Sequence, residues 1–493
     1  MWLWQGEGYW LVRFLFQRAL ALIYLLAFLV AANQFRPLAG EDGLLPIDRY
    51  VENVSFSDRP SLFYLLPDDR VIGATAWIGV LLSVMALVGV PYWLPDAYAT
   101  PVSMLIWATM WLLYLSFVNA GQTFYGYGWE SMLLETGFLA IFLGAGNVAP
   151  PFVVIVLLQW VLFRNMFGAG LIKLRGDECW RDLSCMDYHY ETQPIPNPVS
   201  WFAHHRSKRF HRLETLGNHV VELAVPFLYF APQPLAALAG AATILFQGWL
   251  MVTGNFAWLN ALTIVLAIST FSDGVLTGVL PVSAPATLAT PTYLEVLAIL
   301  VALVVVALSV RPTANMLSRT QVMNTSFDPL HLVNTYGAFG SITKDRYEIV
   351  VEGTTDEELT DETEWRPYAF KGKPTDPERR PPQVAPYHLR LDWQLWFAAM
   401  SPSPYRSPWF PRLLIKLLEG DEATLDLLAE NPFPDELPEY VRATRYRYRY
   451  TTPEERGETS RWWEREPVGT YVRPTSLEDV ERRKPRRRRR WTS

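Results

Sequence analysis

The sequence predicts a polytopic α-helical membrane protein that carries a smaller, water-facing, β-rich (α+β) C-terminal domain. Hydrophobic residues make up 50% of its 493 residues, and they are concentrated in long apolar runs between residues 11 and 311. From residue 318 onward the chain becomes charged and rich in proline and tyrosine. Such a change in composition indicates a domain boundary, and the long apolar runs exclude an ordinary soluble helical protein.

The apolar runs set the number of membrane spans that we expect. A bilayer core roughly 30 Å thick requires about 20 mostly apolar residues in a helix. Four early runs meet this requirement, at residues 11–32, 71–93, 102–120 and 152–174. Shorter or later candidates lie at residues 131–143, 220–230, 234–252, 256–271 and 293–310. We predict about eight or nine spans, within a range of roughly five to nine. The first run lacks a cleavage pattern, so we expect it to remain a span.

These spans divide the chain into three predicted parts. Residues 1–316 form a transmembrane helical domain with a polar loop at 173–216, residues 317–475 form the water-facing domain, and residues 476–493 form a disordered basic tail. With nine spans, the segments 33–70, 173–216 and 312–493 share one side of the membrane. Because these segments carry nearly all loop arginines and lysines, the positive-inside rule favours the cytoplasm for that side.

Polar side chains within the apolar runs are candidates for function, because charged groups at membrane depth are costly. Glu130 and Glu135 lie in the short run near residues 131–143, and Arg164 and Asn165 lie in the run 152–174. A carboxylate and a guanidinium can satisfy one another, so we expect an ion pair between Arg164 and Glu135. Such a pair has two interpretations, a fixed helix contact or a direct part in ligand binding or chemistry.

The densest polar segment beside the membrane is residues 168–219. Prolines at 194, 196 and 198 exclude a helix, so residues 193–198 are expected to form an extended loop. The chain's two cysteines, Cys179 and Cys185, lie just before it. They are candidates for a structural disulfide in an oxidising compartment, for packed free thiols or for redox chemistry. Their spacing is not that of a zinc site, and we expect no metal and no cofactor.

A second functional hypothesis starts from the ionisable residues of this region. His189 and Glu191 are spaced to share one face of a strand, where they could act as an acid–base pair. Together with Glu135, Arg164 and Lys173 they are the catalytic candidates of a membrane-embedded enzyme that acts on a lipid or a protein side chain. A transporter is not favoured, because the sequence contains no internal repeat.

The C-terminal part combines strand and helix patterns. Residues 346–353 and 444–450 alternate in polarity as strands do, and residues 388–400 and 410–430 have helical spacing. The net charge of −6 conceals an arginine-rich run at residues 482–490. Such a run is expected to be disordered and to be attracted to an anionic leaflet. Without a recognition fold, we expect no nucleic-acid partner.

Several motifs resemble those of the lipase maturation factor family. In the membrane part they are residues 121–131 (GQTFYGYGWES), 163–168 (FRNMFG), 197–198 (NP), 246–248 (FQG), 253–256 (TGNF) and 259–260 (LN). In the C-terminal part they are residues 332–340 (LVNTYGAFG), 346–353 (RYEIVVEG) and 385–393 (APYHLRLDW). The motifs extend from about residue 119 to about residue 450, which is a long stretch for a chance resemblance.

The resemblance implies a maturation factor rather than an enzyme. Members of this family assist the folding and assembly of secreted client proteins such as lipases, by non-covalent contacts that require no catalytic residue. Their partners are the lipid bilayer and a client protein, and the oligomeric state is left open. The resemblance implies the endoplasmic reticulum membrane in a eukaryote, and we expect the plasma membrane in a prokaryote. It also implies a lumenal polar loop and C-terminal domain, which conflicts with the positive-inside count.

Overall fold

The membrane part is a bundle of helices. The computed structural model describes residues 8–278, 282, 285 and 288–483. Within these residues, 6 helical segments are long and apolar enough to cross a membrane. They are α1 (Trp10–Ala39), α3 (Asp69–Val88), α4 (Asp96–Ala120), α6 (Phe152–Arg175), α11 (Leu235–Thr253) and the consecutive pair α14 (Thr292–Leu308) and α15 (Val310–Leu317). The integral membrane character of the chain is therefore confirmed.

Local sequence signals account for the ends of these helices. The Asp68 carboxylate accepts a hydrogen bond from the backbone N–H of Arg70 at 2.6 Å and caps the start of α3. The same helix ends at Gly89, whose φ of 79° lies in the left-handed region that glycine adopts at low cost. Pro91 follows two residues later and cannot continue the helix.

The structure does not confirm the count of eight or nine spans, because three predicted spans are shorter elements. Residues 131–143 lie in α5 (Gly128–Ala140) and a 3₁₀ turn. Residues 220–230 comprise the end of α10 (Lys208–Leu223) and another 3₁₀ turn, and residues 256–271 contain α12 (Leu259–Ala267). All of α5 except Phe138 is buried. Helices surround it in place of lipid, so its length does not have to match the bilayer.

The C-terminal domain is built on an antiparallel sheet, as predicted. Its strands are ordered β2 (Arg366–Pro367), β1 (Arg346–Thr354), β5 (Tyr440–Tyr450) and β6 (Trp463–Thr475). A second, 2-stranded sheet pairs β3 (Ala369–Phe370) with β4 (Leu428–Glu430). Both predicted strands are present, and the buried Tyr448 and Tyr450 alternate with the more exposed Arg447 and Arg449.

Helices cover this sheet on the side of the bundle. The predicted helix at residues 388–400 is α16 (Arg390–Met400). The predicted helix at 410–430 is divided into α17 (Trp409–Leu418) and α18 (Glu422–Leu425), and its last residues belong to β4. Gly420 has a φ of 65° and interrupts the helix. The leucine stripe of α17 is buried, so it contributes to the core of the domain.

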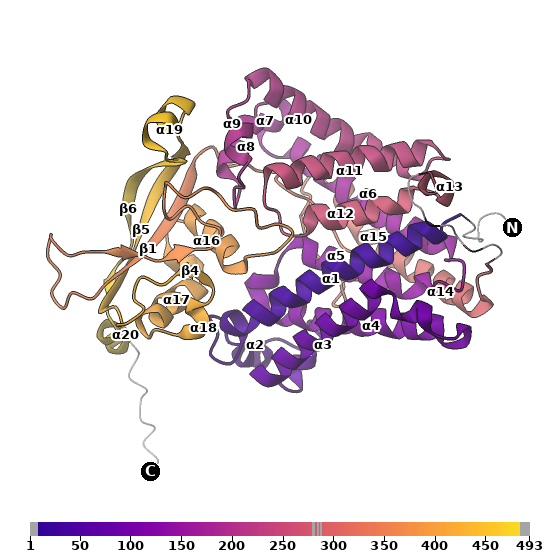
Figure 1. The fold of residues 1–493 in the computed structure, drawn as a ribbon, viewed down its shortest axis with the longest axis horizontal. Coiled ribbons are helices and arrows are strands. Elements are labelled where there is room, and N and C mark those ends of the chain that lie inside the picture. Colours follow the sequence, from indigo (N-terminus) through magenta and orange to yellow (C-terminus); the bar gives the residue numbers. More distant parts are fainter. Residues whose placement is uncertain (1–7, 279–281, 283–284, 286–287, 484–493) are drawn as a thin grey trace, which may run out of the picture.

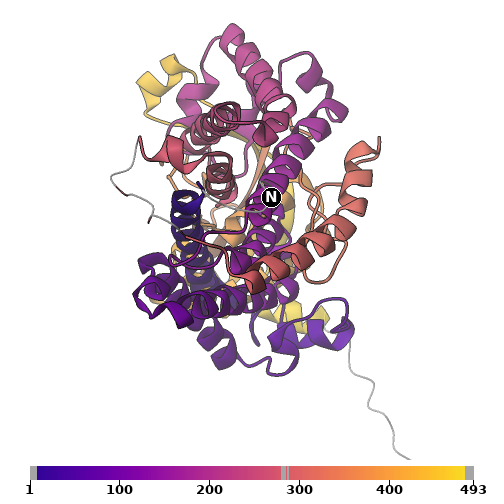
Figure 2. The same ribbon diagram turned by 90° about the vertical axis from the view of Figure 1, so that its right-hand side faces the viewer.

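The C-terminal domain packs against one end of the bundle (Figure 1). The helices α2 (Ile47–Asn53), α7 (Glu178–Arg181), α8 (Met186–Thr192) and α9 (Ser200–His204) lie toward that end, and the N-terminus lies at the opposite end. Figure 2 views the bundle from the end that carries the N-terminus. The segments 33–70 and 173–216 and the C-terminal domain therefore lie toward the same end of the bundle, which the predicted shared membrane side requires.

The tail was expected to be disordered from residue 476 onward, and this is wrong for its first part. Residues Leu477–Arg483 form the helix α20. Glu478 and Asp479 lie in its first turn, where acidic side chains stabilise a helix. The rest of the arginine-rich run, residues 484–493, lies outside the described residues.

Candidate functional site at the junction of the bundle and the C-terminal domain

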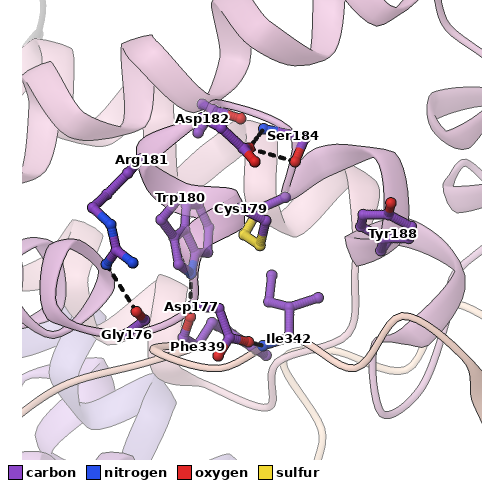
Figure 3. Close-up of a disulfide and its surroundings, with 12 residues drawn as sticks. Gly176, Asp177, Cys179, Trp180, Arg181, Asp182, Ser184, Tyr188, Phe339 and Ile342 are labelled. Atoms are coloured by element: carbon purple, nitrogen blue, oxygen red, sulfur yellow. Dashed lines mark hydrogen bonds between the residues drawn. A yellow bond between two sulfur atoms is a disulfide. The ribbon is translucent and has the colours of Figure 1, made fainter.

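A disulfide between Cys179 and Cys185 closes the polar loop that follows α6 (Figure 3). Two groups beside it bind the segment that leads into the C-terminal domain. The indole N–H of Trp180 donates to the carbonyl of Phe339 at 2.8 Å, and a carboxylate oxygen of Asp177 accepts from the backbone N–H of Ile342 at 2.7 Å. The disulfide therefore stiffens a loop that holds residues 339–342, and such bonds are typical of oxidising compartments.

The expected ion pair between Arg164 of α6 and Glu135 of α5 is present, and both side chains are 1% exposed. It also holds the segment that links the bundle to the C-terminal domain. The Glu135 carboxylate accepts from the Tyr336 hydroxyl at 2.6 Å and from the backbone N–H of Asn334 at 3.1 Å. Arg164 donates to the carbonyl of Asn334 at 2.7 Å. These contacts occupy both charged groups and favour a role in packing.

Glu130, at the start of α5, pairs with a residue of the C-terminal domain. The Arg390 guanidinium, on the first residue of α16, donates to the Glu130 carboxylate at 2.8 Å and to the carbonyl of Phe124 at 2.7 Å. The Tyr114 hydroxyl donates to the same carboxylate. Both charged side chains are fully buried. This pair, between residues 260 positions apart, joins the two parts of the molecule.

A second arginine of the C-terminal domain holds the proline-rich loop. The buried Arg346, on β1, donates to the carbonyls of Glu191 at 2.9 Å and Gln193 at 2.6 Å. Its charge is balanced by Glu348, which also pairs with Lys373 at 2.9 Å. The loop after α8 is not helical, as its prolines predict, but residues 193–195 are bends rather than extended backbone. Arg346 fixes this loop to the sheet.

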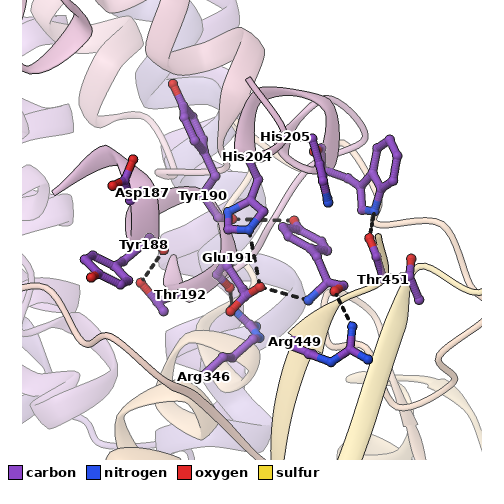
Figure 4. A network of polar contacts seen from close by, with 12 residues as sticks. Asp187, Tyr188, Tyr190, Glu191, Thr192, His204, His205, Arg346, Arg449 and Thr451 are labelled. Carbon is purple, nitrogen blue, oxygen red and sulfur yellow. Dashed lines mark hydrogen bonds and ion pairs between the residues drawn. The ribbon is translucent and has the colours of Figure 1, made fainter. Parts of the chain in front are cut away.

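The predicted acid–base pair of His189 and Glu191 is not formed. Both residues lie on the helix α8, not on a strand, and side chains two positions apart on a helix point in different directions. Glu191 accepts from the backbone N–H of Tyr450 at 2.9 Å and faces His204 at 3.6 Å (Figure 4). Burial raises the pKa of Glu191 and lowers the pKa of His189 to about 3, so His189 is a neutral imidazole.

Two adjoining cavities lie at this end of the bundle. The larger, about 570 Å³, lies between the bundle and the C-terminal domain, and its aromatic lining includes Trp129, Phe256, Tyr336, Phe339, Trp396 and Phe397. The smaller, about 300 Å³, lies among α6, α10, α11 and α12. Both are lined by Asn165, His189, Phe256, Leu259, Ala338 and Phe339. Asn165 also donates to the Thr263 hydroxyl at 2.9 Å.

The catalytic candidates do not gather in one place. Lys173 and His189 line the smaller cavity, whereas Glu135, Arg164 and Glu191 line neither of these two. Lys173 is paired with Glu222 at 2.6 Å. The enzyme hypothesis required convergence on one cavity, so the arrangement argues against that constellation. Within the described residues, the structure has no group of three side chains that could hold a metal ion.

Sequence patterns alone do not identify the residues of the C-terminal domain that bind the bundle. Arg346 and Arg390 lie within the motifs at residues 346–353 and 385–393, and Lys373 lies outside the motifs. Asn255 lies in the motif at residues 253–256, but the motif did not predict its contacts: its side-chain oxygen accepts from the backbone N–H groups of Val384 and Ala385, each at 2.8 Å. An arginine among apolar residues at the start of a predicted helix could have indicated that Arg390 is a buried charge with an acidic partner.

The same two parts of the chain match two family models. The lipase maturation factor transmembrane domain matches residues 11–278, and the lipase maturation factor C-terminal domain matches residues 332–473. No solved structure matches the chain.

Whole-chain relatives agree with the family models. Lipase maturation factor 1 of Bos taurus is 42% identical over 96% of this chain and 90% of its own length. That of Homo sapiens is 41% identical, over 96% and 89%. Lipase maturation factor 2 of Rattus norvegicus is 29% identical, over 94% and 83%. The protein described here, with its helical membrane bundle and its docked β-rich domain, belongs to the lipase maturation factor family.

Proposed function

We propose that this protein is a membrane-bound factor that assists the maturation of lipases by holding incompletely folded client chains. The observation that carries the proposal is similarity to lipase maturation factor 1 along 96% of the chain, at 42% identity. Ionisable groups at the junction are paired with one another inside the protein, as Glu130 is with Arg390 and Glu135 is with Arg164. Non-covalent holding of a client fits this arrangement better than catalysis does.

The rim of the larger cavity is the surface that we assign to the client. Phe397 and Met400 of α16 are 42% and 39% exposed, and Met323 of the linking segment is 40% exposed. Exposed apolar side chains next to a cavity are a common feature of protein-binding surfaces, and methionine adapts its shape to different partners. An incompletely folded lipase exposes apolar segments that fit such a surface.

The junction faces the lumen of the endoplasmic reticulum in a eukaryotic host, or the outer side of the plasma membrane in a prokaryotic one. The disulfide of Cys179 and Cys185 supports this orientation, because such bonds persist in oxidising compartments. The opposing arginine and lysine count includes Arg346, Lys373 and Arg390, which are buried in ion pairs. They also belong to a large domain, and the positive-inside rule applies mainly to short loops.

The finer topology belongs to the same proposal. Residues 1–316 form the transmembrane domain, and residues 317–475 form the client-facing domain. The shorter elements around α5, α10 and α12 carry the chain back across the membrane between the six long apolar helices. A membrane-impermeant thiol reagent tests the orientation in intact cells or sealed microsomes. Labelling of Cys179 and Cys185 from the outer or lumenal side only after reduction supports it, and labelling only from the cytoplasmic side contradicts it.

The maturation role is tested by co-expression with a secreted lipase in cells that lack their own maturation factor. The wild-type chain is expected to restore secreted lipase activity, and Phe397→Asp is expected to reduce it severalfold without lowering the amount of the membrane protein. Val468→Asp on β6 is the matched control, because Val468 is exposed at 52% and lies away from the cavity lining. Failure of the wild-type chain to raise lipase activity would contradict the role.

A further inference from the structure

The smaller cavity has features that client holding does not explain. It lies beneath the surface of the bundle, between α10 and the membrane-spanning helix α11, and its volume of about 300 Å³ is at the lower limit of typical ligand pockets. Apolar side chains such as Met166, Phe246 and Leu250 form most of its wall. It is therefore suited to a ligand with a long apolar part.

The cavity reaches the surface where lipid is expected. Gly217 of α10 and Trp249 of α11 both line it and are exposed, Trp249 at 39%. The exposed residues of α10 around Gly217 are apolar: Leu213, Leu216 and Val220 are 67%, 49% and 50% exposed. Exposed apolar side chains beside a spanning helix are expected to face acyl chains. The entrance between α10 and α11 therefore opens sideways, toward the bilayer.

The cavity also contains hydrogen-bond donors. Asn260 of α12 is 3% exposed and lines the cavity, and its side-chain N–H group has no hydrogen-bond partner among the described residues. A buried donor without a partner is rare, because it costs about 1–3 kcal/mol. The Lys173 ammonium lines the same cavity, donates to Asn218 at 2.9 Å and Glu222 at 2.6 Å, and lies 4.9 Å from the centre of the Trp180 ring.

We propose that this cavity binds a single acyl lipid that enters from the bilayer between α10 and α11. The acyl chain lies against the apolar wall, and an oxygen of its carboxyl or ester group accepts a hydrogen bond from Asn260. A free fatty acid and an acyl ester of a membrane phospholipid share this chemistry. Peptide segments are disfavoured, since an extended backbone would bring further N–H and C=O groups into a mostly apolar cavity. The site does not depend on the proposed function.

Photo-crosslinking tests the proposal on the purified full-length protein without any client. Two probes are used, a fatty acid and a phosphatidylcholine that each carry a diazirine in the acyl chain, and crosslinked peptides are identified by mass spectrometry. The expected result is labelling of α6, α10, α11 or α12 by at least one probe, and the probe that labels identifies the source of the lipid. Absence of labelling by both probes, or labelling confined to the larger cavity, would overturn the proposal.

Three variants make the test specific. Gly217→Trp should close the entrance and reduce labelling at least fivefold, and it should fold, because Gly217 is exposed and a Cβ added there meets no atom within 4 Å. Gly248→Trp on α11 is the matched control, since it also meets no atom within 4 Å but does not line the cavity. Equal labelling of both variants would overturn the proposal. Asn260→Leu should weaken probe binding about fivefold to tenfold, the worth of one hydrogen bond; unchanged binding would refute the role of Asn260.

Displacement with a peptide tests the alternative that the cavity binds a protein segment. An apolar peptide from a lipase client should not compete with either probe for the cavity, since it binds elsewhere or not at all. Complete displacement of both probes by the peptide would assign the cavity to protein segments and would overturn the lipid proposal. A protein that binds neither probe but restores lipase activity contradicts only this proposal. A protein that binds a probe but does not restore lipase activity contradicts only the proposed function.

Discussion

The ion pair of Glu130 and Arg390 is expected to dominate the docking of the C-terminal domain onto the bundle. Both side chains are fully buried. Glu130→Gln would leave the Arg390 guanidinium buried without a counter-charge, and the loss of one partner of a buried pair costs about 3–5 kcal/mol. Arg390→Met would likewise leave the Glu130 carboxylate buried without a counter-charge. The double variant removes both charges, so most of the loss should be recovered, with a coupling energy of about 2 kcal/mol or more.

The free energy of unfolding of the four proteins, measured by SDS titration in mixed micelles, tests this expectation. Protease release of the C-terminal domain should rise in each single variant and fall again in the double variant. The control cycle uses Arg447 and Asp345, an ion pair whose side chains are 56% and 44% exposed. Its coupling should be about 0–1 kcal/mol. Single effects at Glu130 and Arg390 that add within about 0.5 kcal/mol would refute the reasoning.

Three further predictions follow from contacts described above. Replacing Cys179 and Cys185 with serine should lower the free energy of unfolding by about 2 kcal/mol, because the short loop that they close restricts the unfolded chain. A reductant should have no further effect on the thermal midpoint of this variant. A further decrease would contradict the prediction. Arg346→Met should speed amide hydrogen exchange in residues 191–198 at least tenfold, with unchanged exchange as the contrary outcome. Burial lowers the pKa of His388 to about 4, below its unfolded value of about 6.5. The folded protein therefore binds fewer protons between these values, so stability should fall as the pH falls through this window, by up to about 1.4 kcal/mol per pH unit. His388→Phe should flatten this slope in thermal unfolding at pH 7 and pH 5, and an unchanged slope would contradict it.

The sequence was sufficient for elements whose signals are local. The long apolar runs identified all six long apolar helices of the described residues, because hydropathy over about 20 residues is a direct signal of bilayer crossing. Three prolines at alternate positions excluded a helix at residues 193–198, and alternating tyrosines predicted β5. The pair of Arg164 and Glu135 could be inferred because the chain offered few intramembrane charges to combine.

Features that depend on distant contacts could not be inferred in this way. The partner of Glu130 lies 260 positions away, and nothing near either residue indicates the other. The spacing of His189 and Glu191 suited a strand, but the segment follows the disulfide as a short helix that packs against the bundle. The short helices α5 and α12 resembled full spans, because composition does not reveal whether lipid or protein surrounds a helix.

The distance in sequence between Glu130 and Arg390 also has a consequence for synthesis. Ribosomes add about 5–20 residues per second, so the 260 positions between the two residues correspond to roughly 10–50 s. During that interval the nascent bundle carries a carboxylate whose cationic partner does not yet exist. Chains that stop before Arg390 would keep this unpaired charge permanently. Premature termination between residues 130 and 390 is therefore expected to damage the membrane-embedded half as well as to remove the C-terminal domain.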